Sequence, residues 1–211
     1  MLRMPPCMCT ASLHDYKKRD GRHGVKTETS YGQPLGGICQ VAYVVEDLHQ
    51  GMKDFGKKFN IGPWFYADEY VFKTAKHRGQ PTDMKIGLAL AFSGHMCFEL
   101  IKTLDDKPSV YREVINKRGY GYHHLGLATR TFEKDVERFH QMGYELAFEG
   151  STPRGIRFAY FDTTTDMPGM LEVIEFNDMQ DKFLLLMQQA SFNWNGRDPA
   201  RKIETILSQL T

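Results

Sequence analysis

Two glutamates lie in the middle of apolar segments, where an unpaired carboxylate is costly to bury. Glu99 stands in the run FELI at 98–101, and Glu172 stands in the similar run LEVI at 171–174. Both runs have the composition of β-strands. A carboxylate is tolerated at such a position when it is paired or bound to a metal ion. The two glutamates therefore indicate a buried polar site.

A weak internal repeat supplies two further candidates. The run 40–48 is similar to the run 124–132 at a shift of 84 positions, and each run predicts a strand followed by a helix. Side chains alternate between the faces of a strand, which places Gln40 and His124 opposite the bulky apolar residues, on the concave side. Four polar side chains, two from each half, are thus expected to converge between the halves.

An amide, an imidazole and two carboxylates form a ligand set for a divalent metal ion. The set suits Zn²⁺, Ni²⁺, Co²⁺, Mn²⁺ or Fe²⁺ better than Cu⁺ or an iron–sulfur cluster, and it leaves the choice among them open. Two carboxylates also neutralise the charge of the ion. The alternative is that both glutamates face solvent on edge strands. The repeat-equivalent positions of Gln40, Glu99, His124 and Glu172 favour the shared metal site.

The remaining pattern predicts the elements that position these residues. Apolar residues at helical spacing predict one helix over 48–59 and another over 132–142, with Asp47 and Thr131 as N-caps. Strand-like runs separated by Gly, Pro, Ser or Asp follow each helix. They cover 64–70, 70–74, 84–92 and 95–103 in the first half, and 144–148, 156–161 and 170–176 in the second. The predicted fold class is α+β.

Composition narrows the function classes. The chain of 211 residues has a formal net charge of +1, so it lacks the basic excess expected of a nucleic-acid-binding protein. No apolar stretch reaches the roughly 20 residues needed to cross a membrane. Four cysteines in a chain of this length do not make a disulfide scaffold. We therefore expect a soluble, cytoplasmic protein without nucleic-acid or membrane partners.

The chain divides into three predicted segments. Residues 1–35 carry six basic and three acidic residues, show no apolar periodicity, and predict a loosely ordered basic tail. Residues 36–178 contain the two repeated units, at about 36–105 and 119–178. Residues 179–211 predict a helical extension, with helices over 179–190 and 199–210.

At the residues described above, the chain resembles the vicinal oxygen chelate superfamily, which includes glyoxalase I, methylmalonyl-CoA epimerase, extradiol dioxygenases and bleomycin-resistance proteins. The runs 40–48 and 124–132 are similar to its opening strand–helix signature, and the runs 98–101 and 171–174 to its metal-carrying closing strands. The resemblance implies paired βαβββ modules that form a curved mixed sheet around a divalent metal ion.

One position departs from the commonest pattern of that superfamily. Gln40 stands where the first strand usually carries histidine. The resulting Gln/Glu/His/Glu set is similar to that of eukaryotic-type glyoxalase I. It counts against the extradiol dioxygenases, whose iron needs two histidines and one carboxylate. The runs GPWF at 62–65 and WNGRDP at 194–199 look like a glyoxalase-like branch near the epimerases.

The ligand set predicts proton transfer next to a carbonyl group. A bound metal ion would polarise the carbonyl of a small-molecule substrate and stabilise an enolate. Glu172 and Glu99 would then move the proton, as in an isomerase, epimerase or lyase, unless both act as metal ligands only. A second hypothesis is a non-catalytic protein that binds or sequesters an apolar or aromatic compound. The third and weaker hypothesis is a ring-cleaving dioxygenase.

Three residues are candidates for a substrate pocket. Trp64 and Tyr66 are aromatic residues of the first strand after the helix, and His95 lies four residues before Glu99 on the same strand face. Alternation places His123 on the face opposite His124, where it would pack against a helix or lie at the surface. Paired modules of this superfamily often associate, so a homodimer is compatible with the sequence, although no feature requires one.

Overall fold

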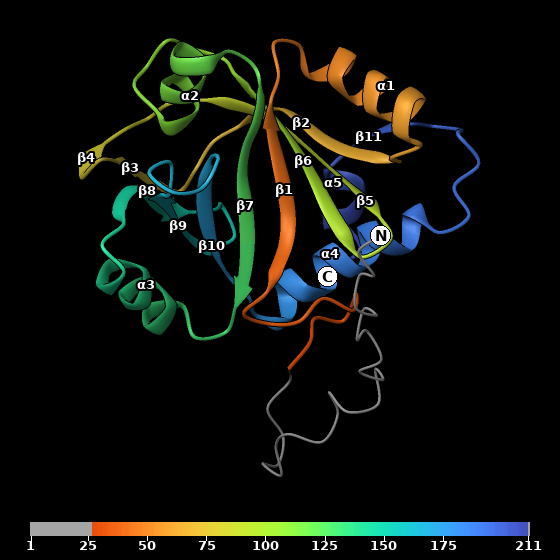
Figure 1. The fold of residues 1–211 in the computed structure, drawn as a ribbon. Coiled ribbons are helices and arrows are strands. Elements are labelled where there is room, and N and C mark those ends of the chain that lie inside the picture. The colour runs from red at the N-terminus through yellow and green to blue at the C-terminus, as the bar shows by residue number, and fades with distance from the viewer. Residues whose placement is uncertain (1–26, 211) are drawn as a thin grey trace, which may run out of the picture.

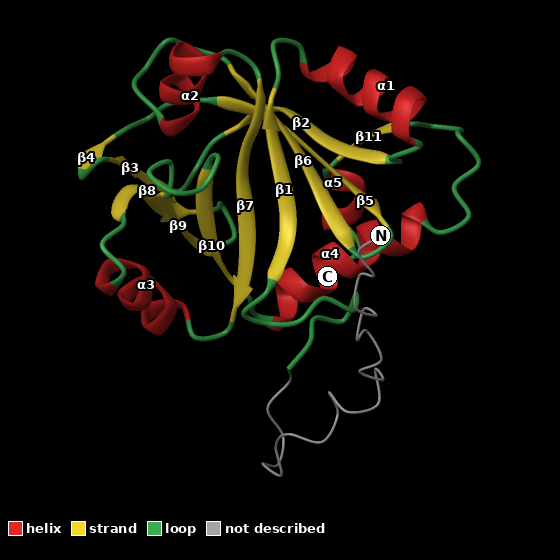
Figure 2. Cartoon of the chain, in the orientation of Figure 1, coloured by secondary structure: helices red, strands yellow, loops and turns green. Residues whose placement is uncertain are grey.

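The computed structural model describes residues 27–210, whose strands join into one 11-stranded mixed sheet (Figures 1 and 2). The strands are β1 (Ile38–Val44), β2 (Trp64–Tyr70), β3 (Thr74–His77), β4 (Gln80–Pro81), β5 (Ile86–Ser93), β6 (Met96–Thr103), β7 (Gly121–Thr129), β8 (Glu145–Ser151), β9 (Arg157–Asp162), β10 (Met170–Glu175) and β11 (Ala200–Lys202). The helices are α1 (Leu48–Phe59), α2 (Val110–Arg118), α3 (Phe132–Gln141), α4 (Asp178–Ser191) and α5 (Glu204–Leu207). No helix in this part of the chain is long and apolar enough to cross a membrane.

The sheet consists of two similar halves that meet at β1 and β7. The first half has the strand order β2-β5-β6-β1, and the second has the order β7-β10-β9-β8. In each half the opening strand pairs in parallel with the closing strand, β1 with β6 and β7 with β10, while β1 and β7 are antiparallel. The predicted α+β fold of paired βαβββ modules in a mixed sheet is confirmed.

The sheet curves until its two ends approach each other. Strand β2 lies near one end, and the next strand in the chain, β3, pairs with β8 near the other end. Only residues 71–73 connect them, and the four steps from Tyr70 to Thr74 span at most about 14 Å. The sheet is therefore a cup whose concave face can surround a site.

The helices cover different faces of this cup. Helix α1 packs on β5 and β6, and α3 packs on β9 and β10, both on the outer face. Helix α4 packs on the concave side, where Phe183 and Leu184 join a buried cluster with Leu90 and Ile174. Asp47 caps α1 as predicted by accepting a hydrogen bond from the backbone of Gln50, whereas the side chain of Thr131 does not cap α3.

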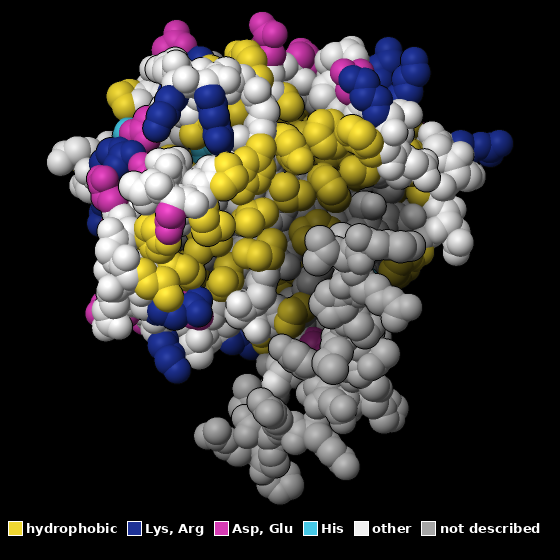
Figure 3. Space-filling model, in the orientation of Figure 1, with side chains coloured by type: hydrophobic (Ala, Val, Ile, Leu, Met, Phe, Trp, Pro, Cys, Tyr) yellow, Lys and Arg dark blue, Asp and Glu magenta, His cyan; other side chains and the backbone are white. Residues whose placement is uncertain are grey.

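The outer face of β1 and β7 lies between α1 and α3 and remains partly uncovered. Apolar side chains gather there in a broad patch (Figure 3). Tyr43 of β1 contacts Phe55 of α1, with ring centroids 5.3 Å apart, and Leu125 of β7 packs against the cluster beneath α3, but both residues remain half-buried. The bulky apolar face of the two strands therefore packs against helices only in part.

The ends of the described chain differ from the predicted segments. Residues 27–35 are packed rather than loosely ordered, because the ring of Tyr31 is buried against Phe92 and Phe176. The rest of the predicted tail, 1–26, lies outside the described residues. In the C-terminal extension, β11 replaces part of the predicted second helix because residues 200–202 pair with the edge of β2. Helix α2, which connects the halves, was not predicted.

A glycine at the centre of the cup allows the strands to bring polar side chains together. Gly126 of β7 is paired with Gln40 on one side and with Glu172 on the other. A Cβ atom at this position would lie 2.9 Å from the Cβ of Gln40 and 2.9 Å from the Cδ1 of Ile174. Real Cβ atoms do not approach this closely, so a side chain at 126 would push Gln40 and Ile174 aside.

Gly126→Ala is therefore expected to lower the free energy of unfolding by about 1 kcal/mol, since overpacking outweighs the usual benefit of alanine in a strand. Gly56→Ala in α1 is the matched control, because its nearest contact is the carbonyl oxygen of Ile61 at 3.6 Å. This control is expected to raise stability by up to about 1 kcal/mol. Chemical denaturation of both variants measures the difference. Equal stability of the two alanine variants would contradict the packing argument.

Candidate metal centre

Two rows of paired residues across the centre of the sheet position the four predicted ligands. In one row, Ala42 of β1 is paired with both Glu99 of β6 and His124 of β7. In the other, Gly126 lies between Gln40 and Glu172. Because strand neighbours project to the same face, the small residue in each row leaves space in which the larger polar side chains meet.

The ends of the Gln40 and His124 side chains lie within hydrogen-bonding distance of each other and of both glutamates. His124 Nε2 is 3.3 Å from Glu99 Oε2 and 3.2 Å from Glu172 Oε2. Gln40 Nε2 lies 3.0 Å from Glu99 Oε2, 3.3 Å from Glu172 Oε2 and 3.4 Å from His124 Nε2. All four residues are less than one-tenth exposed. The structure thus brings together every residue of the predicted ligand set.

This spacing fits the donor shell of a divalent metal ion. Donors about 2.1 Å from an ion, at angles between square and tetrahedral, lie about 3–3.5 Å apart. The distances from His124 Nε2 to Glu99 Oε2 and to Glu172 Oε2 fall in this range, and one ligand atom from each of the three residues lies within 4.8 Å of the other two. A half-turn of the Gln40 amide exchanges Nε2 for Oε1, the atom that can bind a cation. The residues present therefore fit a divalent ion.

The electrostatics of the cluster also favour a cation. Burial raises the pKa of Glu99, and the hydrogen bond from His124 opposes this effect. Burial by itself would lower the pKa of His124, but hydrogen bonds to Glu172 and Glu99 outweigh it and raise the pKa to about 9. At neutral pH a proton on His124 thus compensates part of the carboxylate charge. A metal ion bound at His124 Nε2 would displace that proton.

His123 contacts the imidazole of His124 from behind. Nδ1 of His123 lies 2.9 Å from Nδ1 of His124, and Nε2 of His123 lies 3.2 Å from the carbonyl oxygen of Val110. Since that carbonyl only accepts, Nε2 of His123 carries the proton and its Nδ1 accepts from His124. This chain of hydrogen bonds leaves Nε2 of His124 to face the two carboxylates.

A β-bulge explains why the two histidines meet. Ala42 is paired with His124, but Tyr43 is paired with Tyr122, so His123 has no partner across the strand pair. An extra residue of this kind disrupts strict alternation. The prediction that His123 points to the face opposite His124 is therefore wrong, although its ring does contact Tyr111 of helix α2.

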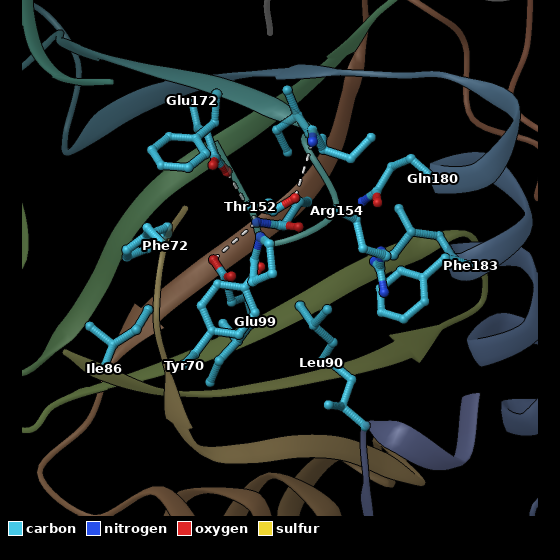
Figure 4. Close-up of a pocket in the computed structure, with 18 of the residues that line it drawn as sticks. Tyr70, Phe72, Ile86, Leu90, Glu99, Thr152, Arg154, Glu172, Gln180 and Phe183 are labelled. Atoms are coloured by element: carbon cyan, nitrogen blue, oxygen red, sulfur yellow. Dashed lines mark hydrogen bonds between the residues drawn. The ribbon is translucent and has the colours of Figure 1, made fainter. Parts of the chain in front are cut away.

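A cavity of about 150 Å³ lies above the cluster. An apolar cavity with a few converging polar groups is typical of a small-molecule site. Gln40, Glu99 and Glu172 form part of its lining, and Figure 4 shows the two carboxylates at one side. The walls are largely apolar and aromatic, and they comprise Tyr70, Phe72, Ile86, Leu88, Leu90, Tyr111, Ile156, Phe158, Tyr160, Ile174, Phe183, Leu184, Ile203 and Leu207.

The three predicted pocket residues do not line this cavity. Trp64 is fully buried in the cluster beneath α1, and Tyr66 packs against the same cluster. Alternation along β2 turns both toward the outer face. His95 lies in the turn before β6, where its Nδ1 is 2.6 Å from the carbonyl oxygen of Tyr31. His95 precedes Glu99 by four residues along the strand, a distance of about 13 Å, and therefore lies far from the predicted metal ligands.

Strand alternation does not place several of the wall residues in the cavity. Tyr70 stands an even number of residues after Trp64 and Tyr66, so alternation predicts that all three face outward. An irregularity in the β2–β5 pairing between Ala67 and Tyr70 instead turns Tyr70 into the cavity. Arg154 lies in a turn, where strand alternation does not predict the direction of a side chain. Residues of α2 and α4 reach the cavity through tertiary packing alone.

Comparison with known proteins places this architecture in a family. A model of the Glyoxalase/Bleomycin resistance protein/Dioxygenase superfamily matches residues 39–160, a segment that includes Gln40, Glu99 and His124. The chain belongs to this superfamily. Its members commonly use divalent metal ions, which agrees with the donor set described above.

Two solved structures show the same fold within the superfamily. One is a hypothetical protein from Bacillus halodurans C-125, with 15% identity, a TM-score of 0.51 and coverage of 67% of this chain and 95% of that chain. The other is methylmalonyl-CoA epimerase from Mycobacterium tuberculosis, with 16% identity, a TM-score of 0.51 and coverage of 75% of this chain and 96% of that chain. No curated protein sequence matches significantly.

Removal of the hydrogen-bond acceptor behind His124 is expected to weaken metal binding. His123→Phe should lower the affinity for Zn²⁺ about 10- to 100-fold, because His124 would lose the partner that orients Nε2. His123→Asn, which keeps an acceptor, should lose less. Competition with a chromophoric chelator measures the affinities, and the exposed His140→Phe serves as control. Unchanged affinity in folded His123→Phe would contradict the orienting role.

Proposed function

We propose that the protein is a divalent-metal-dependent isomerase, epimerase or lyase that moves a proton next to a carbonyl group of a small molecule. The observation that supports it most directly is the placement of two carboxylates. Glu99 and Glu172 come from different halves of the sheet and both line the floor of one apolar cavity. They flank the point where Gln40 and His124 meet them.

A metal ion held by Gln40, Glu99, His124 and Glu172 would polarise the carbonyl and acidify the adjacent carbon. The chain's own carboxylates can then exchange the proton. One glutamate accepts it from the substrate carbon, and the other can deliver a proton from the opposite side. Removal and delivery on opposite faces produce epimerisation, while delivery to a neighbouring carbon produces isomerisation.

The cavity walls support this chemistry by limiting water and supplying weak acids. Burial raises the pKa of the Tyr70 hydroxyl to about 12, and burial also raises the pKa of Tyr111 and of Tyr160 well above the usual value. All three phenols therefore stay protonated and can donate hydrogen bonds to a substrate oxygen. The Tyr111 and Tyr160 hydroxyls are hydrogen-bonded to each other at 3.2 Å, which leaves one of the two protons to reach a substrate oxygen.

Isotope exchange tests the proposal. The metal-loaded protein is expected to exchange the α-proton of at least one probe in D₂O, with methylmalonyl-CoA, phenylpyruvate and 2-cyclohexenone as probes. Glu99→Gln and Glu172→Gln should each slow the exchange by about 100-fold or more, since each removes a proton acceptor. Proton NMR follows the α-signal, and elemental analysis reports the metal content of each variant.

Glu149→Gln is the matched control, because Glu149 lies on β8 and pairs with Lys76 away from the cavity. Absence of exchange with every probe, despite stoichiometric metal, would contradict the proposal. Tight binding of the same probes without exchange would favour the second function, a protein that sequesters apolar compounds. The apolar lining of the cavity is the observation that keeps this alternative open.

We further propose that the apolar patch over β1 and β7 mediates a homodimer. A contiguous apolar surface on a sheet face, as Figure 3 shows over β1 and β7, is typical of a protein–protein interface. Tyr43 of β1 and Leu125 of β7 are half-buried. Leu125→Arg should convert the dimer to a monomer in size-exclusion chromatography with light scattering. Phe192→Arg, an exposed apolar position after α4, should not. A monomeric wild-type protein at micromolar concentration would refute the dimer.

A further inference from the structure

One charged side chain in the cavity has no part in the metal centre. Arg154 lies in the turn between β8 and β9, and it is the sole lysine or arginine among the described residues that line the cavity. Figure 4 shows it beside Gln180 and Phe183, across the cavity from Glu99 and Glu172. No ion pair or hydrogen bond connects its guanidinium to another described residue, and its Nε is buried without a partner.

Arg154 differs from the other partly buried arginines of the described chain in having neither an acidic partner nor a hydrogen-bond acceptor, since Arg201, which also lacks an ion pair, donates to the carbonyl oxygen of Asp198. Arg78, Arg112, Arg130, Arg138 and Arg157 each form an ion pair with a carboxylate. The guanidinium of Arg154 instead lies 4.0 Å above the ring of Phe183, and burial lowers its pKa. The buried Nε of this cation has no acceptor among the described residues, and a ligand in the cavity can supply one.

The turn holds this side chain in a defined place. The Thr152 backbone donates to the carbonyl of Ile156 at 2.9 Å, and the Ile156 backbone donates to the Thr152 hydroxyl at 3.1 Å. Gly155 completes the turn with a φ of +82°, a conformation that suits glycine. The ring of Phe183 on α4 then supports the guanidinium through a cation–π contact. Arg154 is thus fixed at the cavity wall and not free at the surface.

We propose that Arg154 binds the carboxylate of a monoanionic, apolar carbonyl compound whose carbonyl end lies at Glu99 and Glu172. This proposal rests on the proposed function and names its substrate class. A guanidinium recognises a carboxylate through two parallel hydrogen bonds, and the amide of Gln180 on the same side of the cavity can donate a third. The apolar walls between the two ends fit an alkyl or aryl body.

Charge balance supports one negative charge on the ligand. The carboxylates of Glu99 and Glu172 match the charge of a divalent ion, which leaves the positive charge of Arg154 to be neutralised. A polyanion such as coenzyme A would find only one cationic side chain among the described residues of this cavity, so most of its negative charge would have no partner. The class we infer therefore differs from the acyl-CoA for which the structurally similar methylmalonyl-CoA epimerase is named.

Matched acids and esters test the inference. The probes are ω-benzoyl alkanoates with two to five methylene groups and their methyl esters, and isothermal titration calorimetry measures their binding to the metal-loaded protein. At least one acid should bind about tenfold or more tightly than its ester, since the ester lacks the charge. Arg154→Met and Arg154→Gln should abolish this preference, and Arg154→Lys should keep part of it.

Arg197→Met is the control, because Arg197 is exposed and outside the cavity, and it should keep the preference. Equal affinity of acids and esters for wild type, or a preference that survives in Arg154→Met and Arg154→Gln, would overturn the role of Arg154. The same probes separate this failure from that of the proposed function. Selective binding of acids without deuterium exchange would reject catalysis and retain the anion site.

Discussion

The burial of two carboxylates at one point is the constraint on which the rest of the structure depends. Glu99 and Glu172 are each less than one-tenth exposed, and their oxygens approach the same imidazole nitrogen. Two such charges in a low-dielectric site require a cation or protons nearby. The raised pKa values of Glu99 and His124 express this requirement. The small residues Ala42 and Gly126 make the approach possible, because they leave the space in which the polar side chains meet.

The cup around this cluster separates two chemical environments. Its floor is polar and belongs to the strands that both halves contribute. Its walls are aromatic, and helices α2 and α4 complete them. Arg154 introduces a second charged point at the wall, supported by Phe183 of the C-terminal extension. A ligand that reaches from one point to the other must be apolar in between. In the proposed function, helix α4 would therefore contribute to specificity, while the repeated strands would carry the chemistry.

Departures from strand periodicity mark the places where sequence-based prediction failed. The bulge at His123 brings its ring to His124, and the irregular pairing before Tyr70 turns that ring into the cavity. Both changes reverse the face that alternation predicts. Trp64 and Tyr66 follow alternation and consequently lie beneath α1, outside the cavity. The packing of Tyr31 against Phe92 and Phe176 likewise has no periodic signature, because it joins segments far apart in the chain.

The sequence by itself determined the α+β fold, the order of the two modules and the convergence of Gln40, Glu99, His124 and Glu172. Strand periodicity is visible in neighbouring residues, and the internal repeat shows which strand positions of the two halves are equivalent. Only the tertiary structure decided which residues form the cavity. Tyr70, Tyr111, Arg154 and Phe183 come from a strand end, a helix, a turn and a second helix. Their proximity results from sheet curvature and helix packing, which no local pattern of residues encodes.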